Sequence, residues 1–297
     1  TAERMLNYYR PKSVTQALSI LNDSSETAVP YAGATDLIPR YSKGTAKRPA
    51  VMVDLKTIEE LHGVSEDAGE IRIGACTLMS ELASDPVLLK KATILAEAAG
   101  RIACPQVRNR ATIGGNLCNA SPAADTAVPL IVLDAELELH SLDSQNTKSA
   151  QGTTRRRIHV TDFFKGPGAT RLAPGEIVVA IRFKPLPPGV YAAWDKFGTR
   201  PSMEIAVASV GVALLMEKGK VTRARIGYGS VAPTPLRGRK AEAALFNEVF
   251  TQEVIDRCVA AAREEISPIS DLRATENYRR EITGVMLARL LEGAQHA

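Results

Sequence analysis

The segment Ala111–Asp134 reads ATIGGNLCNASPAADTAVPLIVLD and joins a glycine pair, small polar side chains and an apolar helix. Residues 111–113 are typical of a strand end, and Gly114-Gly115 follow without Cβ atoms, so the backbone can turn tightly or another group can come close. Ser121 before Pro122 predicts a helix start with Asp125 in its first turn, and residues 128–133 continue as an apolar helix. Free N–H groups at such a helix start suit a phosphate or a polyol. The alternative is an ordinary capped turn.

A second glycine turn lies about 80 residues earlier in the chain. Residues 28–32 form a predicted strand that ends in Gly33-Ala34-Thr35-Asp36-Leu37. Apolar spacing predicts a helix over 14–21, and 51–55 reads as another strand, so 1–60 is a β/α unit. Neither turn has the G-x-G-x-x-G pattern of a Rossmann fold. Two such turns could grip one pyrophosphate from both sides, so we expect them to meet in one cleft.

The rest of the chain divides at Lys184–Gly189, where three prolines in four positions interrupt helix and sheet. Before it, alternation predicts strands at 70–75, 136–140, 157–160 and 176–183, a long helix over 86–102, and a polar loop over 141–154. After it, 191–197, 205–216 and 221–231 read as an antiparallel meander. Helices are expected over 240–246, 253–265 and 274–291.

Composition limits the function classes. The 297 residues are 45% hydrophobic and 24% charged, which is enough for about two globular domains. The net charge of +4 is mild and the basic clusters lack interleaved aromatic residues, so no nucleic-acid partner is expected. No apolar run reaches the ~20 residues of a membrane span, and the N-terminal residues lack a signal-peptide pattern, so a cytoplasmic protein is predicted. The four cysteines and four histidines match no metal-ligand spacing, so no metal site is predicted.

Both glycine turns and several other motifs resemble one family. The central motifs are AGATDL at 32–37, PQVRN at 105–109, TIGGNL at 112–117 and ASPAAD at 120–125. The match extends over essentially the whole chain through further motifs, which are Lys196-Phe197, Arg200, Ile205-Ala206, GSVAPTP at 229–235, Leu272-Arg273-Ala274 and Tyr278-Arg279-Arg280. The sequence resembles the FAD-binding (medium) subunit of the molybdenum hydroxylases, the carbon monoxide dehydrogenase and xanthine dehydrogenase family.

The resemblance implies an α+β protein with a vanillyl-alcohol-oxidase (PCMH)-type FAD-binding fold. Two FAD-binding subdomains would occupy 1–60 and 61–186. A C-terminal domain over 190–297 would hold a three-stranded antiparallel sheet and a helical bundle.

The resemblance also implies roles for individual residues. The first turn would bind the FAD pyrophosphate through backbone N–H groups and the second would close on the same phosphates. The implied cofactor-binding residues are Ala32, Gly33, Ala34, Thr35, Asp36, Leu37, Ile102, Thr112, Ile113, Gly114, Gly115, Asn116, Asn119, Asp125, Ile177, Val178 and Lys196. Asn119 and Asp125 would bond the ribityl and ring side, Ile102 would pack on the adenine, Ile177 and Val178 would lie near the isoalloxazine, and Lys196 would reach the flavin edge.

Two further positions bear on this resemblance. Trp194 occupies a position where some relatives place an aromatic residue close to the ring. Ala34 stands where many members have a second glycine, and its methyl group favours negative φ.

The function implied is that of an electron-transfer flavoprotein subunit. A large partner with a molybdenum-pterin cofactor would hydroxylate the substrate. A small partner with two [2Fe-2S] clusters would relay the electrons, and the assembly would be a dimer of heterotrimers. No residue of this chain need act as an acid, base or nucleophile, so no catalytic residue is named. The alternatives are a self-contained FAD-dependent oxidoreductase and a nucleotide-binding module that has lost its flavin.

Overall fold

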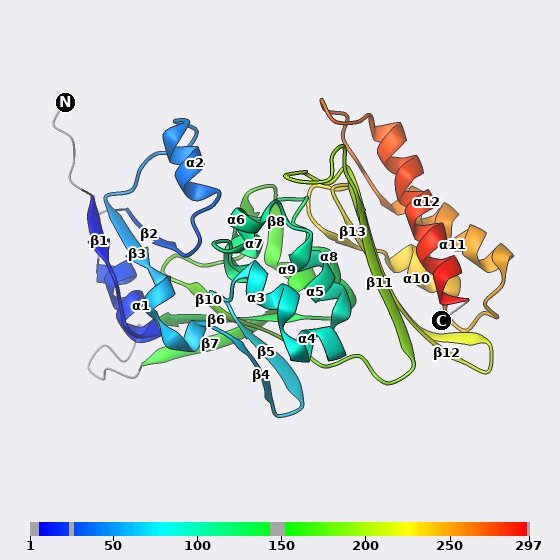
Figure 1. Cartoon of the computed structure of the whole chain (residues 1–297), viewed down its shortest axis with the longest axis horizontal. Coiled ribbons are helices and arrows are strands. Elements are labelled where there is room, and N and C mark those ends of the chain that lie inside the picture. The colour runs from blue at the N-terminus through cyan, green and yellow to red at the C-terminus, as the bar shows by residue number, and fades with distance from the viewer. Residues whose placement is uncertain (1–5, 24–26, 143–151, 296–297) are drawn as a thin grey trace.

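The computed structural model describes residues 6–23, 27–142 and 152–295. Three sheets follow one another along the long axis of the molecule, and the two termini lie at opposite ends (Figure 1). The first has three strands, the second five and the third four, and a two-stranded hairpin is added to the middle region. No helix among the described residues is long and apolar enough to cross a bilayer.

The N-terminal sheet is parallel, with β3 (Val51–Asp54) between β1 (Asn7–Tyr9) and β2 (Ala28–Tyr31). Helix α1 (Val14–Asp23) buries the apolar side chains whose spacing predicted it, Val14, Ala17 and Leu18. The sequence analysis did not predict β1, whose three residues are all exposed. The remaining elements of this part are α2 (Leu37–Ser42) and the short 3-10 helices η1 (Leu55–Thr57) and η2 (Glu59–Leu61).

A polar cluster joins the carboxyl ends of these three strands. The hydroxyl of Tyr8 donates to Asp54 Oδ2 (2.6 Å) and lies 2.5 Å from the hydroxyl of Tyr31. Lys56 Nζ is 2.6 Å from the other carboxylate oxygen of Asp54. Because Tyr31 is the last residue of β2, this cluster fixes the point from which the first glycine turn departs.

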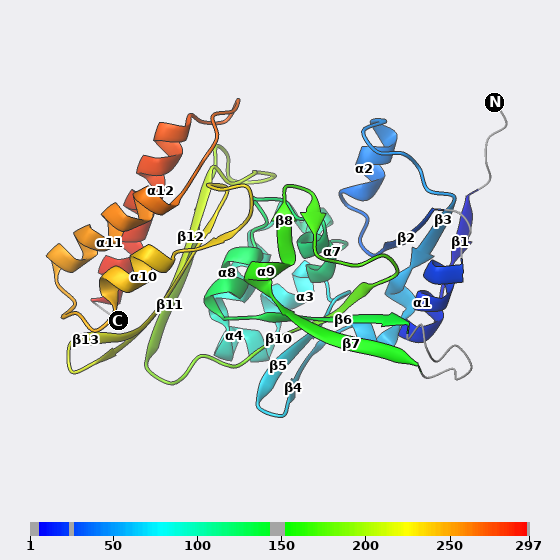
Figure 2. The ribbon, with the colours of Figure 1, turned by 180° about the vertical axis from the view of Figure 1, so that it is seen from behind.

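The middle sheet has the order β4-β5-β10-β6-β7, with the apolar β10 (Ile177–Phe183) at its centre. Its other strands are antiparallel neighbours: β4 (Val64–Asp67), β5 (Glu70–Gly74), β6 (Glu136–Leu142) and β7 (Thr153–His159). Seen from behind, β6 and β7 run across the molecule below a group of helices that includes α7, α8 and α9 (Figure 2). The helices and hairpin of this region are α3 (Met79–Ser84), α4 (Pro86–Lys91), α5 (Thr93–Gly100), α6 (Pro105–Arg108), α7 (Ile113–Cys118), α8 (Ala127–Val132), α9 (Val160–Phe163), β8 (Phe164–Gly166) and β9 (Ala169–Thr170).

Two boundaries of this region differ from the prediction. The helix expected over 86–102 is divided into α4 and α5 at Ala92, whose backbone is non-helical (φ −153°, ψ 47°). Strand β7 begins at Thr153, and β6 continues to Leu142, so the predicted loop over 141–154 is shorter at both ends. Residues 143–151 of that loop lie outside the described residues.

The central segment also folds differently from the prediction. Gly114 and Gly115 lie inside helix α7, and Thr112 makes only an isolated bridge with Leu78 instead of ending a strand. Ser121 does not begin a helix: its hydroxyl accepts the N–H of Ala123 (3.2 Å) as an N-cap would, but the residues that follow form only a turn. Helix α8 begins after Thr126, so Asp125 precedes the helix and is not in its first turn.

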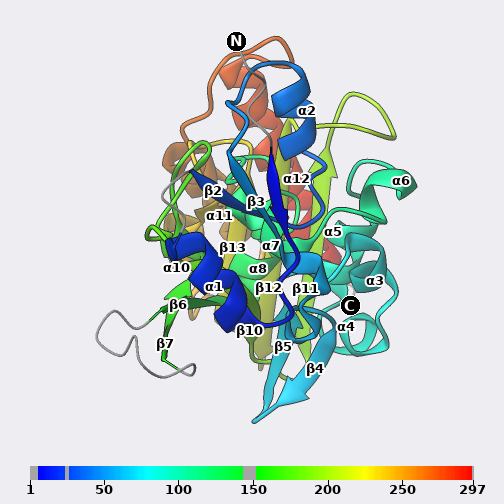
Figure 3. The same ribbon diagram turned by 90° about the vertical axis from the view of Figure 1, so that its left-hand side faces the viewer.

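The C-terminal sheet is antiparallel and has four strands instead of the predicted three, because the short β14 (Leu236–Arg237) pairs with β13 (Lys220–Gly229). Strands β11 (Val190–Phe197) and β12 (Ala208–Glu217) complete it. Helices α10 (Arg239–Leu245), α11 (Gln252–Glu265) and α12 (Glu276–Ala294) lie on the side away from the rest of the molecule (Figure 1). Viewed from the N-terminal end, α1 and β1 are in front and these helices are behind (Figure 3).

Glycines let the middle region pack on this sheet. Helix α8 is wholly buried, and Cβ atoms added at Gly211 on β12 or Gly229 on β13 would lie 3.1 Å and 3.0 Å from its Val128 side chain. A side chain at these positions would therefore push α8 off the sheet.

Candidate cofactor-binding site

The two glycine segments touch each other. A Cβ on Gly33 would lie 2.1 Å from the carbonyl oxygen of Arg110 and 2.9 Å from Cα of Ala111. No side chain fits into that space, so Gly33 lets the first turn rest directly on the backbone that leads into α7. Gly33 thus lies against the residues that lead into the second segment, as the expectation of neighbouring turns requires; a shared cleft stays a prediction.

The first turn presents unused backbone donors. The N–H groups of residues 33–36 donate to no other described residue, and Thr35 and Asp36 are exposed. Ala34 has φ +57°, so it adopts the left-handed conformation that its methyl group was expected to disfavour. The carbonyl of Ala34 accepts the N–H of Ile38 (3.1 Å), which holds the turn in this shape at the start of α2. The turn is therefore a preformed set of donors suited to an anion.

The second segment uses its donors within the protein. The N–H groups of Ile113 and Gly114 donate to the carbonyls of Thr77 (3.1 Å) and Ala75 (2.8 Å). The N–H of Gly115 donates to Thr112 Oγ1 (3.2 Å), which caps the helix. The start of α7 therefore offers a ligand no free N–H group at residues 113–115.

Other groups on α7 remain exposed or polar. Gly115 is exposed, and an added Cβ there would meet only Thr112 Oγ1 at 2.9 Å. Asn116 Oδ1 accepts the hydroxyl of Thr126 (2.6 Å), and Asn119, at the end of the helix, is partly exposed. A ligand could therefore approach the backbone of α7 closely at Gly115 and bond the amide side chains of Asn116 and Asn119.

A buried ion pair lies at the next predicted position. Lys196 Nζ is 2.7 Å from Asp125 Oδ2 and 3.5 Å from Glu204 Oε1, and the Lys196 side chain is 0% exposed. Burial raises the pKa of the Asp125 carboxyl, and the Lys196 ammonium opposes that rise. The second oxygen of Asp125, Oδ1, is buried and has no hydrogen-bond partner among the described residues. An unpaired buried carboxylate oxygen is costly, so this atom is available to a donor on a ligand.

Arg101 locks this pair to the end of helix α5. Its guanidinium donates to Asp195 Oδ1 (2.7 Å) and to the carbonyl of Lys196 (3.1 Å), and Lys196 Nζ donates back to the carbonyl of Arg101 (2.8 Å). The guanidinium also lies over the ring of Trp194, 5.0 Å from its centre, and Trp194 is buried. Lys196 therefore has little freedom to move.

The remaining predicted residues are apolar and nearly closed to solvent. Ile102 is 8% exposed, while Ile177 and Val178 on β10 are 2% and 4% exposed. Ala75 connects β10 to α7, because its N–H donates to the carbonyl of Val179 (3.0 Å) and its own carbonyl accepts the N–H of Gly114. The structure thus brings Gly33 against Arg110 and Asp125 against Lys196, and leaves Ile177 and Val178 within the hydrophobic cores.

The sequence analysis gave no role in the site to Ala75, Thr77, Arg101 or Glu204. Their contacts join segments far apart in the chain and carry no local sequence signal. Burial raises the pKa of Cys76 and of Cys118 to about 12, so both are protonated thiols at neutral pH. Within the described ranges, no group of three or more His, Cys, Asp or Glu side chains could hold a metal ion.

Comparison with known families identifies the fold. Residues 4–186 match the family model described as the FAD binding domain in molybdopterin dehydrogenase, and residues 193–294 match the CO dehydrogenase flavoprotein C-terminal domain. The chain belongs to this family. The predicted family and the α+β fold, with FAD as the cofactor of the N-terminal part, are confirmed.

Relatives of this flavoprotein family are similar over nearly their full length. The carbon monoxide dehydrogenase medium chain of Afipia carboxidovorans is 34% identical, over 97% of this chain and 96% of its own. The xanthine dehydrogenase FAD-binding subunit of Escherichia coli O157:H7 is 30% identical, over 97% and 95%. Members of the family are thus FAD-carrying subunits of dehydrogenase complexes.

Solved structures agree with this assignment. Carbon monoxide dehydrogenase from Hydrogenophaga pseudoflava superposes with a TM-score of 0.91 at 33% identity, covering 100% of this chain and 99% of that one. Quinoline 2-oxidoreductase from Pseudomonas putida 86 gives a TM-score of 0.88 at 27% identity, covering 99% and 98%. The arrangement of sheets and helices is therefore that of the family.

Proposed function

We propose that this chain is the electron-transfer subunit of a molybdenum-containing hydroxylase or dehydrogenase complex in the cytoplasm. Its partners would be a small subunit with two [2Fe-2S] clusters and a large subunit with a molybdenum-pterin cofactor, assembled as a dimer of heterotrimers. The chain would hold FAD where electrons from those clusters can reach an external acceptor. The bound flavin supplies the redox chemistry, and the protein supplies its position and electrostatic surroundings.

The contact between Gly33 and Arg110 carries this proposal, because it unites two motif segments that lie far apart in the chain. The unused N–H groups of residues 33–36 fit the pyrophosphate, and the first turn (Ala32–Leu37) would bind it. Since the N–H groups of Ile113, Gly114 and Gly115 are already bonded, Thr112–Asn116 would contribute close approach and the Asn116 side chain.

The flavin end of the cofactor would be held by the buried ion pair. The partnerless Oδ1 of Asp125 fits a donor on the flavin, and Lys196 would lie at the flavin edge. Asn119 would bond the ribityl chain, Ile102 would pack on the adenine, and Ile177 and Val178 would support the isoalloxazine side of the site from β10. In this arrangement the chain's own residues bind and orient the cofactor and transfer no proton.

The test compares the purified wild-type chain with Gly33→Val and with a matched control, Gly166→Val. A Cβ at Gly33 meets the Arg110 carbonyl, whereas a Cβ at Gly166 meets nothing within 4 Å. We expect the wild type and Gly166→Val to release about one FAD per chain on acid denaturation, and Gly33→Val to lose most of it while keeping its helical circular dichroism. Unchanged FAD content in Gly33→Val would contradict the pyrophosphate assignment.

The subunit role is tested separately by affinity purification from the native organism. Two co-purifying chains that carry iron and molybdenum are expected. Substrate oxidation by this chain alone, without partners, would instead indicate a self-contained FAD-dependent oxidoreductase. A chain that neither carries nor takes up FAD would indicate a nucleotide-binding module without flavin.

A further inference from the structure

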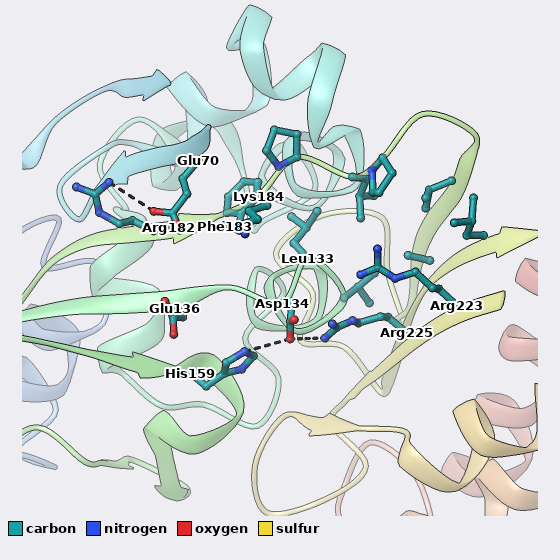
Figure 4. A pocket seen from close by; sticks show the side chains of 17 residues that line it. Glu70, Leu133, Asp134, Glu136, His159, Arg182, Phe183, Lys184, Arg223 and Arg225 are labelled. Carbon is teal, nitrogen blue, oxygen red and sulfur yellow. Dashed lines mark ion pairs between the residues drawn. The ribbon is translucent and has the colours of Figure 1, made fainter. Parts of the chain in front are cut away.

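A second pocket lies at the junction of the FAD-binding part, the proline linker and the C-terminal sheet (Figure 4). Its volume is about 370 Å³, within the range of small-molecule sites. None of the residues assigned above to the flavin lines it. It is therefore a separate cavity with its own chemistry.

Two arginines of β13 face this pocket. Arg223 and Arg225 are two positions apart on the strand, so they project from the same face. Figure 4 shows both guanidinium groups extending from β13 toward Leu133 and Asp134. Arg225 forms an ion pair with Asp134, whose Oδ1 also lies 3.1 Å from His159 Nε2. Arg223 is exposed at the pocket and makes no ion pair with any described residue, so its planar set of donors can bond a ligand in place of solvent.

The charges around the pocket fit a ligand with a single negative charge. Four cationic side chains line it, Arg182, Lys184, Arg223 and Arg225. Three acidic side chains line it as well, Glu70, Asp134 and Glu136. Arg182 is paired, 2.6 Å from Glu138. Like Arg223, Lys184 has no ion-pair partner within the described ranges. A dianion would meet the acidic side chains, whereas one carboxylate can bond the guanidinium of Arg223.

The other walls are apolar and stiff. Leu133, Val190 and the linker residues Pro185, Leu186 and Pro187 line the cavity beside the cations. The proline rings fix their backbone φ angles, so this wall does not collapse easily into the space. The cavity thus combines one free guanidinium with a preformed apolar wall.

We propose that this junction pocket binds a small monocarboxylate with an apolar body, of about the size of an aromatic acid. Its carboxylate bonds Arg223, and its body packs on Leu133 and the linker prolines. Because Arg223 belongs to the C-terminal sheet and Leu133 to the FAD-binding part, the ligand ties these two parts together. It stabilises their junction by mass action.

The test titrates the full-length, FAD-loaded chain with benzoate by isothermal calorimetry. Benzamide, which has the same shape without the charge, and inorganic phosphate, which is anionic but lacks the apolar body, serve as comparisons. Benzoate is expected to bind one site with a Kd of about 1 mM or below and to raise the Tm. Benzamide and phosphate are expected to bind at least about tenfold more weakly.

Arg223→Gln is the decisive variant and Arg155→Gln its matched control. Arg155 is exposed on β7, does not line the pocket and has no ion pair with a described residue. We expect Arg223→Gln to weaken benzoate binding about tenfold or more and Arg155→Gln to leave it unchanged. Independently, benzoate should protect Arg223 from phenylglyoxal modification, measured by mass spectrometry. The proposal would be overturned if benzamide or phosphate bound as tightly as benzoate, or if Arg155→Gln weakened benzoate binding as much as Arg223→Gln. It would also be overturned if benzoate did not protect Arg223 from phenylglyoxal, or if no saturable benzoate binding were found below about 10 mM.

Discussion

Asp125 and Lys196 are 71 residues apart in the chain and form a buried charged contact in the proposed flavin site. Asp125→Asn removes the charge that balances Lys196 and leaves only Glu204, at 3.5 Å, near the ammonium. We expect a loss of about 2–4 kcal/mol in the free energy of unfolding, because an uncompensated buried charge is costly. Weaker FAD retention should accompany it. Urea unfolding at pH 7 and the flavin fluorescence released on dilution measure the two effects.

The matched control for this variant is Asp67→Asn. Asp67 also pairs with an arginine, Arg182 at 3.3 Å, but its side chain is 62% exposed. An exposed pair contributes little, so a change below about 0.5 kcal/mol is expected. If both variants lost the same stability, burial of the Asp125 pair would contribute nothing.

Glu138 predicts a pH dependence of stability. Its carboxylate lies 2.8 Å from His140 Nε2 and 2.6 Å from Arg182 Nε, and these contacts lower the pKa of Glu138 from 4.5 to about 2. The folded-state pKa is below the unfolded one, so the stabilisation is complete above pH 4.5 and is lost as the pH falls toward 2. In urea titrations, the wild type should have a larger free energy of unfolding than Glu138→Gln, and this difference should shrink by about 1–2 kcal/mol from pH 6 to pH 3. A constant margin would contradict this.

The start of helix α7 depends on its cap. Thr112→Val keeps the side-chain volume but leaves the N–H of Gly115 without its acceptor, Thr112 Oγ1. A cost of about 1–2 kcal/mol is expected from losing an N-cap, together with faster FAD dissociation because α7 borders the site. Thr112→Ser keeps the hydroxyl and should behave nearly as the wild type. Equal unfolding curves for the two variants would show that the cap contributes nothing.

The elements that could be predicted are those with a regular apolar pattern. The spacing of Val14, Ala17 and Leu18 identified α1, and the apolar run of β10 identified a buried strand. Helix α7 could not be predicted, because two glycines disfavour a helix and the contact that requires Gly114, with the Ala75 carbonyl, is not local. The motif residues of the site were identifiable from resemblance. Which donors are free and which are already bonded depends on tertiary contacts such as that of Ile113 with Thr77.

At the scale of the whole molecule, helix α8 packs the FAD-binding part on the C-terminal sheet. Gly211→Val would place its Cβ 3.1 Å from the side chains of Val128 and Val132, so the helix must shift. Overpacking of this kind costs about 1–3 kcal/mol, and we expect a lower Tm and faster proteolysis in the linker at 184–189. Gly166→Val, whose Cβ has open space, should do neither. Unaltered cleavage of the linker in Gly211→Val would show that α8 does not hold the two parts together.

The close contact between Gly33 and the Arg110 carbonyl has a consequence for the design of hybrid proteins. A hybrid that takes residues 1–60 from one relative and the remainder from another must join two backbones that leave no room for a side chain between them. Substitutions near Gly33 and near Arg110 should therefore be exchanged together, and a graft that carries one surface without the other should assemble poorly. The first turn and the residues before α7 therefore form one structural unit.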